Sequence, residues 1–175
     1  MLTANDVTVS QFRRSEEFGY FQCEKNGYRE FLQNPEEAEK QSSENLNVTY
    51  VFRHQGKAIG FVALAMSSLR RATLPNERKS EKPYGAVPSL LLGHMARDSK
   101  YKGQGVGDIM MDYVLEKAHE LGKQVGCRFV IVDAEKDKEK LYRDKYGFEL
   151  VPPSPKDETS LMFFDLGLRK PDDAT

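Results

Sequence analysis

Three glycines at alternating positions stand between an apolar run and a long amphipathic segment, in the stretch from Lys102 to Gly107. Glycine lets a phosphate approach the backbone because no Cβ stands in the way, and it tolerates the positive φ values that such loops need. Backbone N–H groups and the positive end of a following helix then favour an anion. The stretch therefore predicts a phosphate-binding loop formed by Lys102, Gly103, Gln104, Gly105, Val106 and Gly107.

Two common phosphate-binding motifs fit this loop poorly. A P-loop places Lys and then Ser or Thr after its glycines, whereas Asp108 and Ile109 follow here. A dinucleotide-binding fingerprint begins directly after its strand, but six polar residues, 97 to 102, intervene in this chain. A plain turn is also disfavoured, because three glycines in five residues cost conformational entropy that a turn does not require.

The elements around the loop can be predicted from hydrophobic spacing. Ser89 to Met95 is a short apolar run, typical of a strand buried on both faces. After the loop, apolar residues at spacings of three and four predict a helix from Asp108 to Leu121. Beyond it we expect a strand, a helix ended by Gly147 and two more strands, at Arg128 to Val132, Asp137 to Tyr146, Phe148 to Val151 and Leu161 to Leu166.

The first half of the chain predicts a strand, short helices and a hairpin. The strand is expected at Val7 to Phe12, the helical pieces between Ser15 and Asn47, and the hairpin at Val48 to Ser67 with Gly56 in its turn. Arg70 to Val87 is expected to be a long loop carrying Arg70, Arg71, Arg78, Lys79 and Lys82. The order of elements indicates an α/β (α+β) domain over residues 1–168 with a mixed sheet flanked by helices, and a disordered tail at 169–175.

Composition excludes several classes of protein. The net charge of -1 is unlike that of a protein whose whole surface holds nucleic acid. No apolar stretch approaches the roughly 18 residues of a membrane helix. Cys23 and Cys127 lack metal-ligand spacing, so we expect reduced thiols, no metal and a cytoplasmic protein that makes no membrane contact.

The loop and the segments after it resemble the GNAT N-acetyltransferase superfamily. Its motif is Gln or Arg, two residues, Gly, one residue, then Gly or Ala; here Lys102, Gly105 and Gly107 stand at those positions. The resemblance continues through Val132-Asp133-Ala134 and Leu141-Tyr142 to Gly147-Phe148. It implies a mostly antiparallel sheet of about six to seven strands, splayed between the fourth and fifth, with acetyl-CoA (coenzyme A) as the cofactor.

The resemblance also implies which residues bind the cofactor. The loop and the helix start would hold the pyrophosphate, and Met95, Ala96 and Arg97 of the preceding strand would pair with the pantetheine arm. The N–H of Met95 would stabilise the oxyanion. Two residues depart from the family: Lys102 replaces Gln or Arg and lacks the bidentate fork, and Asp108 puts a carboxylate beside the expected pyrophosphate.

The family's glutamate base would fall at Leu91, which cannot take a proton. A lysine ε-amine with a pKa of about 10.4 is neutral in about one molecule in two thousand at pH 7, whereas an α-amino group is about a tenth neutral. A site without a strong base therefore favours an α-amino acceptor. His94 is the other titratable group on this strand, either as a catalytic residue or as a core imidazole.

The family's proton donor is a tyrosine four residues before the glycine of the Gly-Phe pair, and Arg143 stands there. Arginine cannot supply a proton, since its pKa exceeds about 12. Tyr142 is one residue earlier, about 100° away around a helix. We expect a π-bulge in this helix to bring Tyr142 to the thioester sulfur; in a regular helix Arg143 would face it instead.

The favoured function is transfer of acetyl from acetyl-CoA to a primary amine in a direct ternary complex. Short matches near Phe21-x-Cys23 and Tyr28-x-x-Phe31 resemble the toxin-type branch that acetylates aminoacyl-tRNA, for which exposed arginines would contact tRNA phosphates. A non-catalytic acyl-CoA-binding module is the third alternative. The sequence leaves open both a small-molecule amine acceptor and a homodimer.

Overall fold

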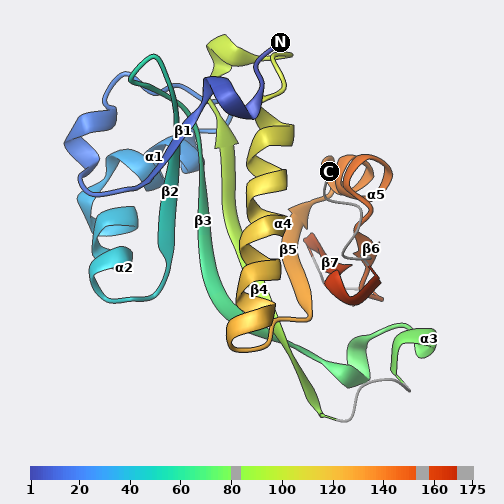
Figure 1. Cartoon of the computed structure of the whole chain (residues 1–175). Helices are drawn as coiled ribbons and strands as arrows, with labels where there is room; N and C mark the ends of the chain where they lie inside the picture. Colours follow the sequence, from blue (N-terminus) through green and yellow to red (C-terminus); the bar gives the residue numbers. More distant parts are fainter. Residues whose placement is uncertain (80–83, 153–157, 169–175) are drawn as a thin grey trace. The chain divides into compact units, whose positions relative to one another are not determined.

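The computed structural model describes residues 1–79, 84–152 and 158–168. Seven strands form one sheet in the order β1-β2-β3-β4-β5-β7-β6 (Figure 1). The pairs β1–β2, β2–β3, β5–β7 and β7–β6 are antiparallel, and the pair β4–β5 is parallel. The strands are β1 Thr8–Gln11, β2 Val48–His54, β3 Lys57–Arg70, β4 Ala86–Arg97, β5 Phe129–Glu135, β6 Glu149–Leu150 and β7 Thr159–Asp165.

Helices of several lengths connect these strands. The α-helices are α1 Asn26–Gln33, α2 Lys40–Ser43, α3 Asn76–Lys79, α4 Val106–Gln124 and α5 Glu139–Tyr146. A π-helical turn, η3 Pro35–Glu39, precedes α2. Short 3₁₀ turns are η1 Ala4–Asp6, η2 Ser15–Phe18, η4 Arg71–Thr73, η5 Ser99–Tyr101 and η6 Leu166–Leu168. The predicted fold class, a mixed and mostly antiparallel sheet with flanking helices, is confirmed.

The chain divides into two compact units, Met1–Ala65 with Gly93–Val114, and Met66–Leu92 with Leu115–Thr175. The parallel ladder between β4 and β5 belongs to the second unit and runs from Ser89↔Phe129 to Leu92↔Val132. It ends there, although β4 continues to Arg97 and β5 to Glu135.

The first unit is built on the β2–β3 hairpin. Gln55 and Gly56 have φ values of 50° and 78°, so both turn residues lie in the left-handed region that a two-residue hairpin needs. Inward side chains of the hairpin pack on apolar residues of the helical segments and strand ends. This core contains Phe12, Phe18, Phe21, Phe31, Leu32, Ala38, Val51, Ala58, Phe61, Ala63 and Ala96.

Gly60 lets the loop-bearing helix lie close to this hairpin. A Cβ built on Gly60 would stand 2.6 Å from Met110 Sδ and 3.1 Å from the carbonyl oxygen of Ala96. Met110 lies in the first turns of α4 and is fully buried. The missing side chain at Gly60 therefore sets how closely the start of α4 approaches β3 and β4.

Two predictions about the chain's organisation need correction. The stretch from Arg70 to Val87 is not a continuous loop, because it contains η4, α3 and the first residues of β4. β4 is also longer than the expected strand and begins at Ala86. Lys82 and the tail at 169–175, which we expected to be disordered, lie outside the described residues.

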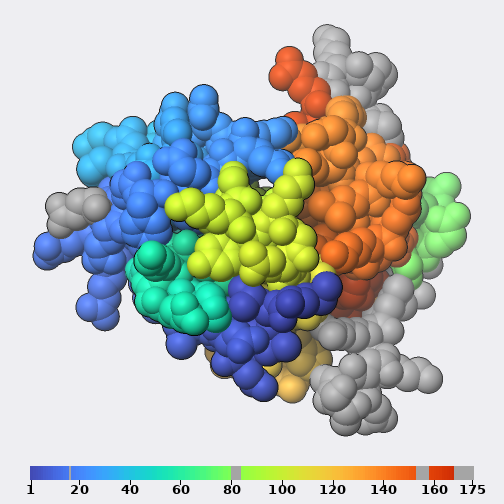
Figure 2. Space-filling view, turned by 90° about the horizontal axis from the view of Figure 1, so that it is seen from above, coloured from blue at the N-terminus to red at the C-terminus, as the bar shows by residue number. Residues whose placement is uncertain are grey.

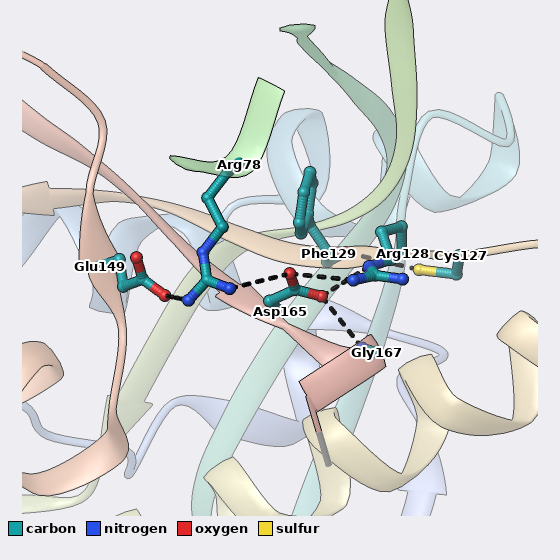
Figure 3. Close-up of polar contacts among 7 residues, drawn as sticks. All are labelled: Arg78, Cys127, Arg128, Phe129, Glu149, Asp165 and Gly167. Carbon is teal, nitrogen blue, oxygen red and sulfur yellow. Dashed lines mark hydrogen bonds and ion pairs between the residues drawn. The ribbon is translucent and has the colours of Figure 1, made fainter. Parts of the chain in front are cut away.

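A buried carboxylate organises the second unit. Asp165, whose side chain is 1% exposed, accepts hydrogen bonds from Arg128 Nε at 2.6 Å and Nη2 at 3.1 Å (Figure 3). The Gly167 N–H donates to the same carboxylate at 3.0 Å. Arg78 Nη1 lies 4.0 Å from it, and a second nitrogen of Arg78 donates to Glu149. Arg78 thus joins α3 to β6 and β7.

This network changes the expectation for the basic residues between Arg70 and Val87. Arg70 and Arg71 are exposed, as contacts with RNA phosphates would require. Arg78 is largely buried between two carboxylates, and Lys79 donates to Asn76 Oδ1 at 3.1 Å. Arg78 is therefore a structural residue of the second unit.

No helix in the described part of the chain is long and apolar enough to cross a membrane. Within the same residues, no group of three or more His, Cys, Asp or Glu side chains is placed to hold a metal ion.

Replacing Asp165 by Ala should lower the free energy of unfolding by about 3 to 5 kcal/mol, because Arg128 and Arg78 lose a buried counter-charge. Urea denaturation followed by circular dichroism measures the change. Asp144→Ala is the matched control, since Asp144 pairs with Arg143 at the surface and its loss should cost about 1 kcal/mol or less. Equal losses for the two variants would contradict the structural role of Asp165.

Candidate functional site

The glycine loop connects η5 to α4 and has the backbone that its sequence predicts. Gly103 and Gly105 have φ values of 76° and 84°, in the left-handed region that side chains disfavour. The third glycine, Gly107, lies in the first turn of α4. The side of Gly103 where a Cβ would stand is open space.

Four backbone N–H groups of this loop are available to a ligand. In the part of the chain that the structure describes, no backbone carbonyl accepts a hydrogen bond from Gly103, Gly105, Val106 or Gly107. By contrast, the N–H groups of Lys102 and Gln104 donate to backbone carbonyls of η5, those of Ser99 and Tyr101. The four N–H groups lie at the start of a 19-residue helix, where the helix dipole adds positive potential. This arrangement fits the diphosphate of coenzyme A.

Two cations flank the loop. Lys102 is its first residue, and the Lys102 side chain is 77% exposed. Arg97 ends β4, and its Nη1 donates to the carbonyl oxygen of Asp98 at 3.2 Å. Both side chains contact one carboxylate, that of Glu24, at 3.1 Å from Lys102 Nζ and 3.6 Å from Arg97 Nη2. The first unit therefore brings together the strand end and the loop that the sequence assigned to cofactor binding.

Asp98 holds this region in place and was missed by sequence reasoning. Its side chain is buried, and its Oδ1 accepts from the Lys100 N–H at 2.9 Å, which caps η5. Its Oδ2 accepts from the Gln22 N–H at 3.0 Å, and the Ser99 N–H donates back to the Gln22 carbonyl at 2.7 Å. An Asp between a strand and a short helix is a capping signal that could have identified the first of these roles.

The N-terminal segment also contacts the loop, as Figure 2 shows where dark blue meets yellow-green. The Leu2 N–H donates to the Gln104 carbonyl at 2.9 Å. A Cβ on Gly105 would stand 3.3 Å from Met1 Cγ and 3.4 Å from the Leu2 carbonyl oxygen. Gly105 is therefore required by this packing and by its φ value, in addition to the phosphate approach that its place in the motif predicts.

The remaining residues that the sequence assigns to the cofactor lie at the end of β4 and the start of α4. Ala96 is buried, and Met95 and Arg97 beside it are half-buried. Val106 is buried in the first turn of α4, where it anchors the loop to the core. Asp108 is half-buried, and its N–H donates to the Gly105 carbonyl at 3.1 Å. Asp108 thus belongs to the turn that starts the helix.

His94 packs among aromatic rings on the same strand. Its ring stacks on Phe31 with centroids 3.9 Å apart and planes 10° apart, and meets Tyr28 edge-on at 5.7 Å. Burial lowers the pKa of His94 below its ordinary value, and the negative charge of Glu37 only partly opposes this shift. The imidazole is therefore neutral at pH 7 and can accept a proton.

Tyr142 and Arg143 belong to the second unit, and the π-bulge expected within their helix is wrong, because α5 is α-helical throughout Glu139–Tyr146. Gly147 follows the helix with a φ value of 74°. Its N–H donates to the Arg143 carbonyl at 3.2 Å, as in an αL cap, and also to the Tyr142 carbonyl. The Phe148 N–H donates to the Tyr142 carbonyl at 3.0 Å, so the turn widens at the end of the helix and not within it.

The two side chains have different surroundings. Tyr142 is half-buried and meets the Phe148 ring edge-on at 5.4 Å. Arg143 is exposed, with its Nε 3.0 Å from Asp144 Oδ1 and its Nη1 3.3 Å from Glu139 Oε1. The regular helix thus ties the Arg143 guanidinium to carboxylates of its own helix.

Known proteins resemble the chain, among them a tRNA-acetylating toxin and the toxin AtaT, which is represented by two solved structures. It is 28% identical over 106 residues to the tRNA-acetylating toxin of Mycobacterium tuberculosis, and the match covers 61% of this chain and 63% of that protein. The chain thus spans less than two thirds of that relative's length. The structure of AtaT complexed with acetyl-methionyl-tRNAfMet has a TM-score of 0.78 at 20% identity, covering 93% of this chain and 96% of that one. A mutant of the AtaT toxin, bound to the C-terminus of the antitoxin AtaR and acetyl-CoA, has a TM-score of 0.71 at 19% identity, covering 93% of this chain and 94% of that one.

The two solved structures, at these identities, establish the fold alone. The family is established by a model described as an acetyltransferase (GNAT) domain, which matches residues 45–150, more than half of the chain. The match contains the glycine loop, the end of β4 and α5. The resemblance inferred from the loop residues is therefore confirmed, and the chain belongs to the GNAT acetyltransferase family.

Proposed function

We propose that the protein transfers the acetyl group of acetyl-CoA to the α-amino group of aminoacyl-tRNA. The observation that carries the cofactor assignment is the loop with two left-handed glycines, four available N–H groups and two flanking cations. Similarity to a tRNA-acetylating toxin supports the acceptor. The proposal treats residues 1–168 as one catalytic domain and includes an antitoxin partner, as in one structural relative.

The chemistry at the acceptor fits the residues on β4. Acetyl-CoA supplies an activated thioester, and an amine attacks it only in its neutral form. Leu91 packs in an apolar cluster and offers no base, which favours an amine that is partly neutral at pH 7. In the proposed reaction the neutral His94 accepts the proton that the attacking nitrogen loses, and the Met95 N–H donates to the developing oxyanion.

Departure of coenzyme A needs a second proton, because the C–S bond breaks to leave a thiolate. We assign this proton to the Tyr142 hydroxyl, which is the family's donor displaced by one residue. Tyr142 is half-buried against Phe148, whereas Arg143 is held by two carboxylates and has no proton to give. The assignment follows the family motif and the local surroundings of the two side chains.

The proposal predicts a preference among acceptors. With labelled acetyl-CoA, we expect label to enter aminoacyl-tRNA at its α-amino group faster than it enters lysine ε-amines of peptides, because fewer ε-amines are neutral at pH 7. Acid-precipitable radioactivity and mass spectrometry of the released aminoacyl adduct measure the transfer. Deacylated tRNA is the control. Transfer only to small amines would favour a small-molecule acetyltransferase, and binding without turnover would favour an acyl-CoA-binding module.

The lowered pKa of His94 predicts how the stability of the protein depends on pH. Because the folded-state pKa lies below 6.5, unfolding takes up a proton at pH values between the two pKa values. Stability should therefore fall as the pH decreases below about 6.5, and it should fall less in His94→Gln. NMR titration should place the His94 pKa below 6.5, and Phe31→Leu should raise it by uncovering the ring. An unchanged His94 pKa in Phe31→Leu would contradict burial as the cause.

Tyr142→Phe should lower turnover by roughly 10- to 10⁴-fold while leaving the affinity for acetyl-CoA nearly unchanged, as expected for loss of a general acid. Arg143→Ala is the neighbouring control and should have little effect, since its guanidinium binds Glu139 and Asp144. Steady-state kinetics and calorimetry separate turnover from binding. The reverse ranking of the two variants would refute the assignment, and full activity in both would make a bound water the proton donor.

A further inference from the structure

Glu24 is bound by both cations that flank the glycine loop. Its Oε1 lies 3.1 Å from Lys102 Nζ, the first residue of the loop, and 3.6 Å from Arg97 Nη2, at the end of β4. Lys102 is 78 residues away from Glu24 in sequence. One carboxylate therefore occupies the two groups whose charge suits a phosphate.

The backbone beside Glu24 is fixed to the loop. The Gln22 N–H donates to Asp98 Oδ2 at 3.0 Å, and the Gln22 carbonyl accepts from the Ser99 N–H at 2.7 Å. On the other side, Cys23 Sγ donates to the Lys25 carbonyl at 3.0 Å. The Glu24 side chain itself is 52% exposed, so it can rotate into solvent while its backbone stays in place.

The electrostatic balance favours exchange. An exposed ion pair is worth about 0 to 1 kcal/mol, because water competes for both partners. A coenzyme phosphate carries more charge than a carboxylate and can accept several charge-assisted hydrogen bonds. An anionic ligand can therefore displace Glu24 from Lys102 and Arg97 at a small but measurable cost.

We propose that Glu24 is an internal competitor of the coenzyme phosphates, which holds Lys102 and Arg97 in the free protein and weakens coenzyme binding. This inference rests on the proposed use of acetyl-CoA. It makes Glu24 a determinant of affinity that the family motif does not contain. Lys102 and Arg97 can bind either the diphosphate or the 3′-phosphate of the coenzyme.

Calorimetry with acetyl-CoA tests the competition. Glu24→Gln should bind about 2- to 10-fold more tightly than wild type at low ionic strength, since the amide releases both cations. The gain should shrink at about 0.5 M salt, where charges are screened. Glu36→Gln is the matched control because Glu36 is also an exposed carboxylate paired with a lysine, Lys40 at 3.0 Å, and it should leave affinity unchanged.

Two further affinity measurements identify the cation and the phosphate that take part in the competition. In the Lys102→Gln background, Glu24→Gln should give a smaller gain, because one of the cations it releases is absent. If 3′-dephospho-coenzyme A shows the full gain, the diphosphate is the competing group; if it shows none, the 3′-phosphate is.

The outcomes separate the two proposals. Equal affinity of wild type and Glu24→Gln, with melting temperatures that match, would overturn the competition while leaving the proposed function intact. A gain as large in Glu36→Gln would reduce the effect to net charge and would also overturn it. Absence of acetyl-CoA binding by the wild-type protein would overturn the proposed function, and this inference with it.

Discussion

The buried carboxylate of Asp98 is the interaction on which the candidate site depends. It caps the turn that leads into the glycine loop and binds the backbone at Gln22, 76 residues earlier in the chain. Together with the bond from the Ser99 N–H to the Gln22 carbonyl, these bonds fix the start of the loop relative to the segment that carries Glu24. A buried carboxylate that accepts backbone N–H groups is stable only when each oxygen is satisfied, so the same constraint that stabilises the turn also places the charges around the loop.

The second unit uses a buried carboxylate in a related way. Asp165 accepts hydrogen bonds from Arg128 and from the Gly167 N–H, and it pairs with Arg78. The pair with Arg78 joins α3, in the stretch from Arg70 to Val87, to β7 near the end of the sheet. The sequence made Arg78 a candidate for RNA contact because it is one of several basic residues. In the structure the charge of Arg78 is paired with carboxylates of the second unit, whereas Arg70 and Arg71 remain exposed.

The reaction proposed for the site relies on a weak base, because the site offers no strong one. His94 is neutral because its ring is packed against Phe31 and Tyr28, and Leu91 stands at the position of the family's carboxylate. Such a site works best on an amine that is already partly neutral. The proposed acceptor, an α-amino group on tRNA, meets that requirement better than a lysine side chain.

The sequence by itself determined the elements and the loop. The spacing of apolar residues predicted most strands and the helices α4 and α5, and the glycines predicted positive φ values within the loop, because these signals depend on neighbours within a few residues. The structure places these φ values at 103 and 105. Only the tertiary structure decided the contacts of Glu24 with Lys102, of Leu2 with Gln104 and of Arg78 with Asp165, which join residues 78 or more positions apart. It also decided that the turn widens at the end of α5, where the sequence indicated a bulge within the helix. These features depend on which side chains the folded sheet brings together, and no local pattern in the chain specifies that.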